Sequence, residues 1–224
     1  MTSIACTLSI GEFSCEVLVP ADLFYNLAVS EWMKKQGDQE FLWKQRLTEE
    51  SVVVEVGGFL GVWASVISEK FNPTIYVLEP SNVYASRLGD RFFGNEKIKI
   101  LPYGLGQPGV IEFSHDGAGS GLYAKKGAAI ESVIIKSFDQ FFLENDLRQI
   151  DLMQVNIEGS EYDLIPQILS SSFRRRIIKI QIQFHLNVDD AIEKRNAIRL
   201  ELAKTHTEIF CYPFVWEAWE LKVD

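Results

Sequence analysis

The feature that most constrains the fold is a short run of β-branched residues that ends abruptly at two glycines. Residues 52–56 are Val-Val-Val-Glu-Val, and Gly57-Gly58 follow directly. A run of this length, bounded by a turn signal, is typical of a strand buried on both faces of a sheet. The same pattern predicts further strands at residues 74–78, 97–101, 150–155 and 176–184.

The segments between these strands have the apolar spacing of helices. Helices are expected at residues 60–70, 82–93, 137–146, 160–171 and 188–204. Strands that alternate with helices of about 10–15 residues form right-handed βαβ units and a parallel sheet. The sequence therefore predicts an α/β fold: a doubly wound, Rossmann-like, mainly parallel sheet with helices on both faces.

Four other segments depart from this alternation. Residues 1–20 predict a strand pair, and residues 21–47 predict one or two helices. The Gly-rich segment 103–135 predicts an antiparallel insertion or a long active-site loop. Residues 207–221 predict a closing strand pair that supplies an antiparallel C-terminal strand.

The length of 224 residues suits one large domain better than two. We expect residues 1–50 to be an N-terminal extension packed on the core and residues 51–224 to be the domain that carries the chemistry. The three cysteines are widely spaced and include no CxxC pair, so neither a disulfide framework nor a zinc site is expected.

The charge balance argues against polyanionic partners. Lys and Arg total 22 against 31 Asp and Glu, which gives a formal net charge of −9. Such a chain is repelled by nucleic acid and by anionic lipid unless it has a local basic patch. The candidate patch, Arg174-Arg175-Arg176, is interpreted as a solvated turn. We therefore expect no nucleic-acid partner and no membrane partner.

The N-terminus lacks a basic region followed by an apolar run, so no secretion signal is predicted, and the cytoplasm is the expected compartment. No apolar stretch approaches the roughly 20 residues of a membrane span. The aromatic residues Tyr212, Phe214, Trp216 and Trp219 are interpreted as packing or as an oligomer surface, which leaves a homo-oligomer open.

A Gly-rich turn beside a carboxylate is the first feature that points to a ligand. Glu55, Gly57 and Gly61 form the pattern E-x-G-x-x-x-G at the end of the first predicted parallel strand, with Gly58 inside the turn. A dinucleotide prefers G-x-G-x-x-G, and Glu55 would repel its pyrophosphate. S-adenosylmethionine (SAM) carries an ammonium and a sulfonium, which suit a carboxylate. Glu79 ends the next strand and is expected to accept hydrogen bonds from ribose hydroxyls.

Five segments together resemble the FkbM-type methyltransferases. Glu55–Gly61 resembles that family's D-x-G-A-N-x-G turn, and Leu78-Glu79-Pro80 resembles its F-E-P. Residues 137–141, Ser-Phe-Asp-Gln-Phe, are similar to its T-L-D-D helix start. Residues 151–161 resemble its I-D-L-L-K-I-D-V-E-G-A-E segment, and residues 181–185 resemble the strand that follows. The resemblance implies a class I methyltransferase fold, SAM as cofactor, and O-methylation of a hydroxyl on a sugar or natural product.

The chain departs from the family pattern at several positions. Glu55 stands where the family has Asp, and Gly58-Phe59 stands where it has Ala-Asn. Gln154 and Asn156 replace Lys and Asp, so one positive and one negative charge are lost together. Because Asn156 is neutral, no metal site is predicted.

Candidate catalytic residues follow two neighbouring predicted strands. Asn156 and Glu158 follow the 150–155 strand, and His185 follows the 176–184 strand. We expect His185, supported by Glu158, to deprotonate an acceptor hydroxyl, because histidine titrates near neutrality. The plainer interpretations are a buried, hydrogen-bonded His185, a helix-capping Glu158 and an Asn156 that only contacts SAM. Ser120 lies in a Gly-rich loop that is interpreted as an adenine contact, a lid or a solvated turn.

These features favour a SAM-dependent methyltransferase acting on a hydroxyl of a small molecule or glycan. The alternatives are a binding module that kept the fold without turnover and, less favoured by charge, a nucleic-acid methyltransferase. A nicotinamide dehydrogenase is disfavoured by the glycine spacing.

Overall fold

The computed structural model describes residues 3–10, 13–115 and 129–223. Its centre is a seven-stranded sheet in the order β11-β12-β10-β9-β3-β4-β5. The five strands from β10 to β5 are parallel, and β12 runs antiparallel to both of its neighbours. The strands are β3 (Val52–Val56), β4 (Thr74–Leu78), β5 (Ile98–Leu101), β9 (Leu152–Val155), β10 (Lys179–Ile182), β11 (His206–Tyr212) and β12 (Trp216–Leu221).

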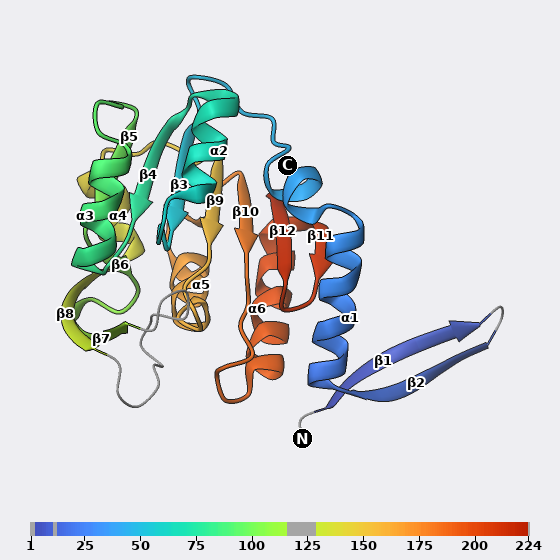
Figure 1. Ribbon diagram of the computed structural model, residues 1–224. Coiled ribbons are helices and arrows are strands. Elements are labelled where there is room, and N and C mark those ends of the chain that lie inside the picture. Colours follow the sequence, from blue (N-terminus) through green and yellow to red (C-terminus); the bar gives the residue numbers. More distant parts are fainter. Residues whose placement is uncertain (1–2, 11–12, 116–128, 224) are drawn as a thin grey trace.

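Helices cover both faces of this sheet (Figure 1). Successive residues of a strand point to opposite faces, so Val53 packs beneath one helical layer and Val54 beneath the other. The first layer contains α2 (Val62–Phe71) and α3 (Asn82–Arg91), and the second contains α4 (Phe138–Glu144), α5 (Glu161–Ser170) and α6 (Ala191–Thr205). The doubly wound α/β prediction, including its antiparallel C-terminal strand, is confirmed.

A small second sheet lies beyond the carboxyl ends of β4 and β5 (Figure 1). It has the order β6-β8-β7 and consists of β6 (Gly104–Leu105), β7 (Gly109–His115) and β8 (Ala129–Lys136). β7 and β8 are antiparallel, whereas β6 pairs with β8 in parallel. The predicted antiparallel insertion is therefore present in the described part of the chain.

The N-terminal segment contributes a hairpin and two helical pieces. β1 (Ser3–Ile10) and β2 (Phe13–Pro20) form an antiparallel pair that extends away from the sheet in Figure 1. Helix α1 (Ala21–Lys34) is followed by a π-helix at Asp38–Leu42. Trp32 of α1 packs in one apolar cluster with Val215 and Trp216, which places α1 against the antiparallel edge of the sheet. The division at residue 50 stays a prediction.

Several boundaries differ from the predicted ones. β10 ends at Ile182 rather than at residue 184, and it begins at Lys179 because Arg174–Arg176 form a 3-10 turn with exposed side chains. His185 consequently lies in the loop after β10. Helix α3 ends at Arg91, two residues early.

None of the helices in the described ranges has both the length and the apolar character required to cross a membrane.

Candidate functional site

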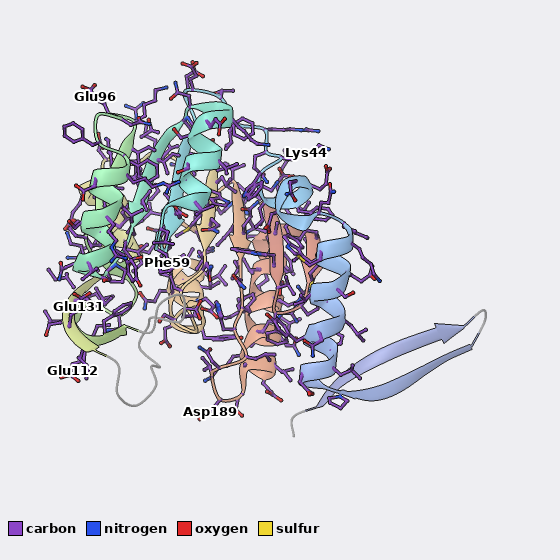
Figure 2. The ribbon with its side chains drawn as sticks, viewed as in Figure 1. Lys44, Phe59, Glu96, Glu112, Glu131 and Asp189 are labelled. Atoms are coloured by element: carbon purple, nitrogen blue, oxygen red, sulfur yellow. The ribbon has the colours of Figure 1, made fainter. Side chains whose placement is uncertain are left out.

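A cavity of about 400 Å³ lies at the carboxyl ends of β3, β4 and β9. Ligands of open parallel sheets bind at this edge. Its apolar wall comes partly from the small sheet and partly from Phe59, which follows β3 and is labelled in Figure 2. The apolar lining includes Phe59, Leu78, Tyr84, Leu105, Ile111, Phe113 and Ile135. The polar lining includes Glu79, Gln107, Asn156, Glu158, Ser160, Asp163 and Gln183.

Gly57 packs so closely against the main chain of Asn156 that there is no room for a side chain, and we call this close approach the Gly57 cradle. Its φ is +92°, and a Cβ built on it would lie 2.1 Å from the main-chain oxygen of Asn156. Only glycine adopts this backbone conformation without strain and allows such a close approach. Gly57 also lines the cavity, so a ligand can lie directly against bare backbone there.

Three amides of this turn already donate to main-chain carbonyl oxygens of the protein. Gly57 and Gly58 both donate to the Leu78 carbonyl oxygen, at 2.9 and 3.2 Å, and Gly61 donates to the Gly58 carbonyl at 2.7 Å. A pyrophosphate site needs such amides free to point at the phosphate. The turn is therefore a poor dinucleotide site, in agreement with the glycine spacing.

Glu79 lines the cavity and is fixed by two backbone donors. Its Oε2 accepts from the Phe59 amide at 2.8 Å, and its Oε1 accepts from the Ser81 amide at 2.9 Å. An ionised carboxylate has about four acceptor positions. These bonds hold the Glu79 carboxylate at the cavity wall. Its assignment to a ribose stays a prediction.

Glu55 does not line the cavity, contrary to the expectation that it contacts the cofactor. It is only 3% exposed and lies beneath the turn, beside the start of α2. Burial raises its pKa well above the ordinary value, and the nearby charge of Glu79 adds to this. The alternation of β3 turns Glu55 to the same face as Val53, toward α2.

Two of the other predicted cofactor residues also lie outside the lining of the cavity. A Cβ on Gly58 would meet the side chains of Val77 and Leu88, so this glycine serves close packing. Gly61, with φ +72°, is the N-cap of α2, so it shapes the helix start. Ser120 lies outside the described residues.

Glu158, His185 and Glu161 form one hydrogen-bonded cluster. The Nε2 of His185 lies 3.2 Å from Glu158 Oε1, and its Nδ1 lies 3.0 Å from Glu161 Oε1. Glu161 is fully buried and also accepts from the main-chain amides of Gly159 and His185, each at 2.8 Å. Glu158 has a φ of +53°, a conformation that non-glycine residues adopt at a cost. The cluster therefore fixes Glu158 at the cavity.

The arrangement does not support His185 as a general base. Burial lowers the pKa of His185, but the hydrogen bonds and charges of Glu158 and Glu161 outweigh burial and raise that pKa to about 9. The imidazole is then protonated at neutral pH, and both of its nitrogens are committed to carboxylates. His185 also does not line the cavity, whereas Glu158 does. Of this pair, Glu158 is the residue that faces the cavity.

Asn156 supplies an unpartnered acceptor at the cavity. Its Oδ1 is buried, and no hydrogen-bond partner for it is found within the described part of the chain. A buried polar atom without a partner costs free energy, so this oxygen suits a ligand that donates a hydrogen bond. Asn156 was predicted at the site, and the structure places it there.

Several site residues carried no recognisable sequence signal. Asp163 and Gln183 line the cavity, but each looks like an ordinary polar position beside a helix or strand end. Glu161 belongs to the E-G-S-E segment, yet an acidic residue in a first helical turn is so common that its partner His185, 24 residues away, was not foreseen. Such pairings depend on how β10 lies beside β9.

A comparison with known families identifies the chain. Residues 55–208, more than half of its length, match the Methyltransferase FkbM domain. The chain belongs to the FkbM methyltransferase family. The match covers the turn, Glu79, Asn156, Glu158 and His185. No curated protein sequence matches this FkbM chain.

Solved structures show the same fold. The FkbM chain is similar to the fibrillarin pre-rRNA processing protein of Methanococcus jannaschii, with TM-score 0.51 and 12% identity over 98% of this chain and 84% of that one. It is also similar to a putative rRNA-methylase from Clostridium thermocellum, with TM-score 0.49 and 9% identity over 84% and 97%. A precorrin-6y C5,15-methyltransferase from Geobacter metallireducens gives TM-score 0.44 and 14% identity over 88% and 87%. The first of these likenesses shows that the two chains share a fold.

Proposed function

We propose that this FkbM protein binds SAM in the cavity and transfers its methyl group to a hydroxyl of a small molecule or glycan. The observation that carries the proposal is the charge of the cavity around the Gly57 cradle. The described lining contains the carboxylates of Glu79, Glu158 and Asp163 and no Lys or Arg. Such a lining favours a cationic ligand over a phosphorylated one.

The residues present fit SAM. The unpartnered Asn156 Oδ1 suits a donor such as the SAM ammonium, and the Glu79 carboxylate lines the cavity and suits hydroxyl donors such as those of a ribose. Gly57 offers bare backbone between them. When bound, SAM supplies an electrophilic methyl group on its sulfonium. The task of the protein is to bring an acceptor oxygen to near-attack distance of that methyl group.

Glu158 is the residue we propose to take the proton from the acceptor hydroxyl. It lines the cavity, and the protonated His185 holds its carboxylate in place through the 3.2 Å contact. When the acceptor oxygen takes the methyl group, the sulfur–methyl bond would break and leave neutral SAH, and Glu158 would accept the proton of the hydroxyl. His185 is thus a positioning residue, and Glu161 fixes His185 in turn.

Methyl transfer from SAM with a radiolabelled methyl group tests this function on a panel of sugars, hydroxylated natural products and RNA. We expect label in a hydroxylated small molecule or glycan and none in RNA. The exposed Arg174–Arg176 turn precedes β10 and therefore lies at the amino ends of the parallel strands, whereas the cavity lies at their carboxyl ends. We do not expect this turn to bind an RNA substrate at the cavity. Binding of SAH, the demethylated product, without transfer to any acceptor would indicate a binding module instead.

Glu158→Gln tests the role of the carboxylate once an acceptor is found. Removal of a general base lowers kcat by about 10²–10⁴-fold, whereas the SAH affinity of the variant should stay within a few-fold of the wild type. Glu193→Gln, an exposed change in α6, is the matched control and should alter neither quantity. An undiminished kcat in a folded Glu158→Gln variant would show that the proton goes elsewhere.

A further inference from the structure

Phe59 has a backbone conformation that bulky side chains avoid. Its φ is +44°, in the left-handed region. Glycine, and to a lesser degree asparagine and aspartate, adopt this region, whereas a large side chain there is an outlier. Such strain persists only when the surrounding structure enforces it, and it concentrates at ligand sites. The presence of a phenylalanine at this position therefore needs a reason.

The core does not supply that reason. Phe59 belongs to none of the three hydrophobic clusters found among the described residues. Its ring is half-buried and lines the cavity. The FkbM pattern has asparagine at this position, a residue that tolerates the left-handed region better. The fold of the turn therefore does not require an aromatic ring.

The surroundings of Phe59 place its ring beside the nucleoside end of the proposed cofactor. Its amide donates to Glu79 Oε2 at 2.8 Å, so its backbone is attached to the carboxylate assigned to the ribose. Its ring meets Tyr84 of α3 edge-on, with centroids 4.7 Å apart and planes at 63°. Tyr84 also lines the cavity. The two rings form one aromatic wall next to Glu79.

We propose that Phe59, supported by Tyr84, is a specificity residue that packs its ring against the adenosine part of SAM. The inference rests on the proposed function. Aromatic side chains bind purines by stacking and by apolar contact, and these interactions tolerate a range of ring orientations. The strained backbone of Phe59 is the cost of holding the ring at the ligand.

Four variants separate the ring from the backbone strain. Phe59→Ala and Phe59→Gly both remove the ring, but only glycine relieves the strain. Phe59→Tyr keeps a ring of the same size. Phe93→Ala is the matched control, because Phe93 is 92% exposed and lies outside the cavity lining. Calorimetric titrations with SAH, and with adenosine alone, measure the affinity of each folded variant.

We expect Phe59→Ala and Phe59→Gly to bind SAH about 5- to 100-fold more weakly than the wild type, the range that base–aromatic stacking supplies. Adenosine should lose affinity by a similar factor. Phe59→Tyr and Phe93→Ala should match the wild type, and Phe59→Gly should melt at a higher temperature than Phe59→Ala, because its backbone is unstrained.

Two results would overturn the inference while leaving the proposed function intact. One is SAH affinity within twofold of the wild type in both ring-deleted variants. The other is a loss of SAH affinity without a loss of adenosine affinity, which would move the contact to the amino-acid end. A wild-type protein that binds no SAH would instead refute the proposed function, and this inference with it.

Discussion

Glu55→Gln should make the protein more stable at neutral pH, although it replaces a buried residue of β3. Glu55 is 3% exposed, and burial together with the charge of Glu79 raises its pKa well above the ordinary 4.5. The carboxyl group is therefore protonated in the folded protein over a range of pH in which it ionises on unfolding. In this pH range the wild type releases a proton from Glu55 on unfolding, which favours the unfolded state. Glutamine has nearly the same shape as glutamate but cannot ionise, so the variant lacks this loss of stability.

The magnitude follows from the linkage between proton binding and stability. A group whose folded pKa is raised contributes stability that is fully present below its unfolded pKa and is lost as pH rises through its folded pKa. Between these two values, the free energy of unfolding falls by about 1.4 kcal/mol for each pH unit. The advantage of Glu55→Gln over the wild type should therefore be small near pH 4.5 and grow at that rate within the window.

Denaturant unfolding followed by tryptophan fluorescence at pH 5, 6, 7 and 8 measures the difference. Glu112→Gln, an exposed change on β7, is the control. Its plot of the free energy of unfolding against pH should run parallel to that of the wild type. Parallel curves for Glu55→Gln as well would refute the reasoning, because they would mean that Glu55 is ionised in the folded protein.

Two further changes test the site. His185→Gln should lower the free energy of unfolding by about 1–3 kcal/mol at pH 7, because Glu158 and Glu161 lose their cationic partner; chemical denaturation measures it. The stabilisation from His185 is fully present below pH 6.5 and is lost as pH rises through about 9, so the difference between the two proteins should shrink there; a constant difference would contradict the assignment. Gly57→Ala should lower Tm and weaken SAH binding, since its Cβ would lie 2.1 Å from the Asn156 oxygen at φ +92°. A wild-type Tm in that variant would show that the cradle is not tight.

The central strands could be predicted to the residue. β3 and β4 have the predicted bounds because each is a mostly apolar, β-branched run closed by a strong stop signal, Gly57 for one and Glu79-Pro80 for the other. β10 was predicted too long because apolar residues lie on both sides of it, Ile177-Ile178 before and Phe184 after, and no composition signal marks where the strand begins and ends.

The site was predicted only in part, because a motif does not say which face each residue takes. Glu55 lies two residues before Gly57, yet the alternation of β3 turns it toward α2 and away from the cavity. The direction of the Glu55 side chain can be predicted only when the face of the sheet on which α2 packs is known. The hydrogen bonds that hold His185 come from Glu161, which α5 brings to the loop after β10. The sequence does not show that these two elements meet. Phe59 was noted as a departure from the family, but its strain becomes visible only in the backbone.

Calorimetric titration of SAH into the wild type and into Glu79→Ala tests the central claim, that the cavity beside Gly57 and Glu79 is a SAM site. The account predicts one SAH bound per wild-type chain and no binding of NAD. Loss of charge-assisted hydrogen bonds of about 1.5–3 kcal/mol each should weaken Glu79→Ala by roughly tenfold or more. Thermal melting must first show that the variant is folded, since Glu79 also accepts from Phe59 and Ser81. Equal SAH affinity in the folded variant, or tight NAD binding by the wild type, would contradict the account.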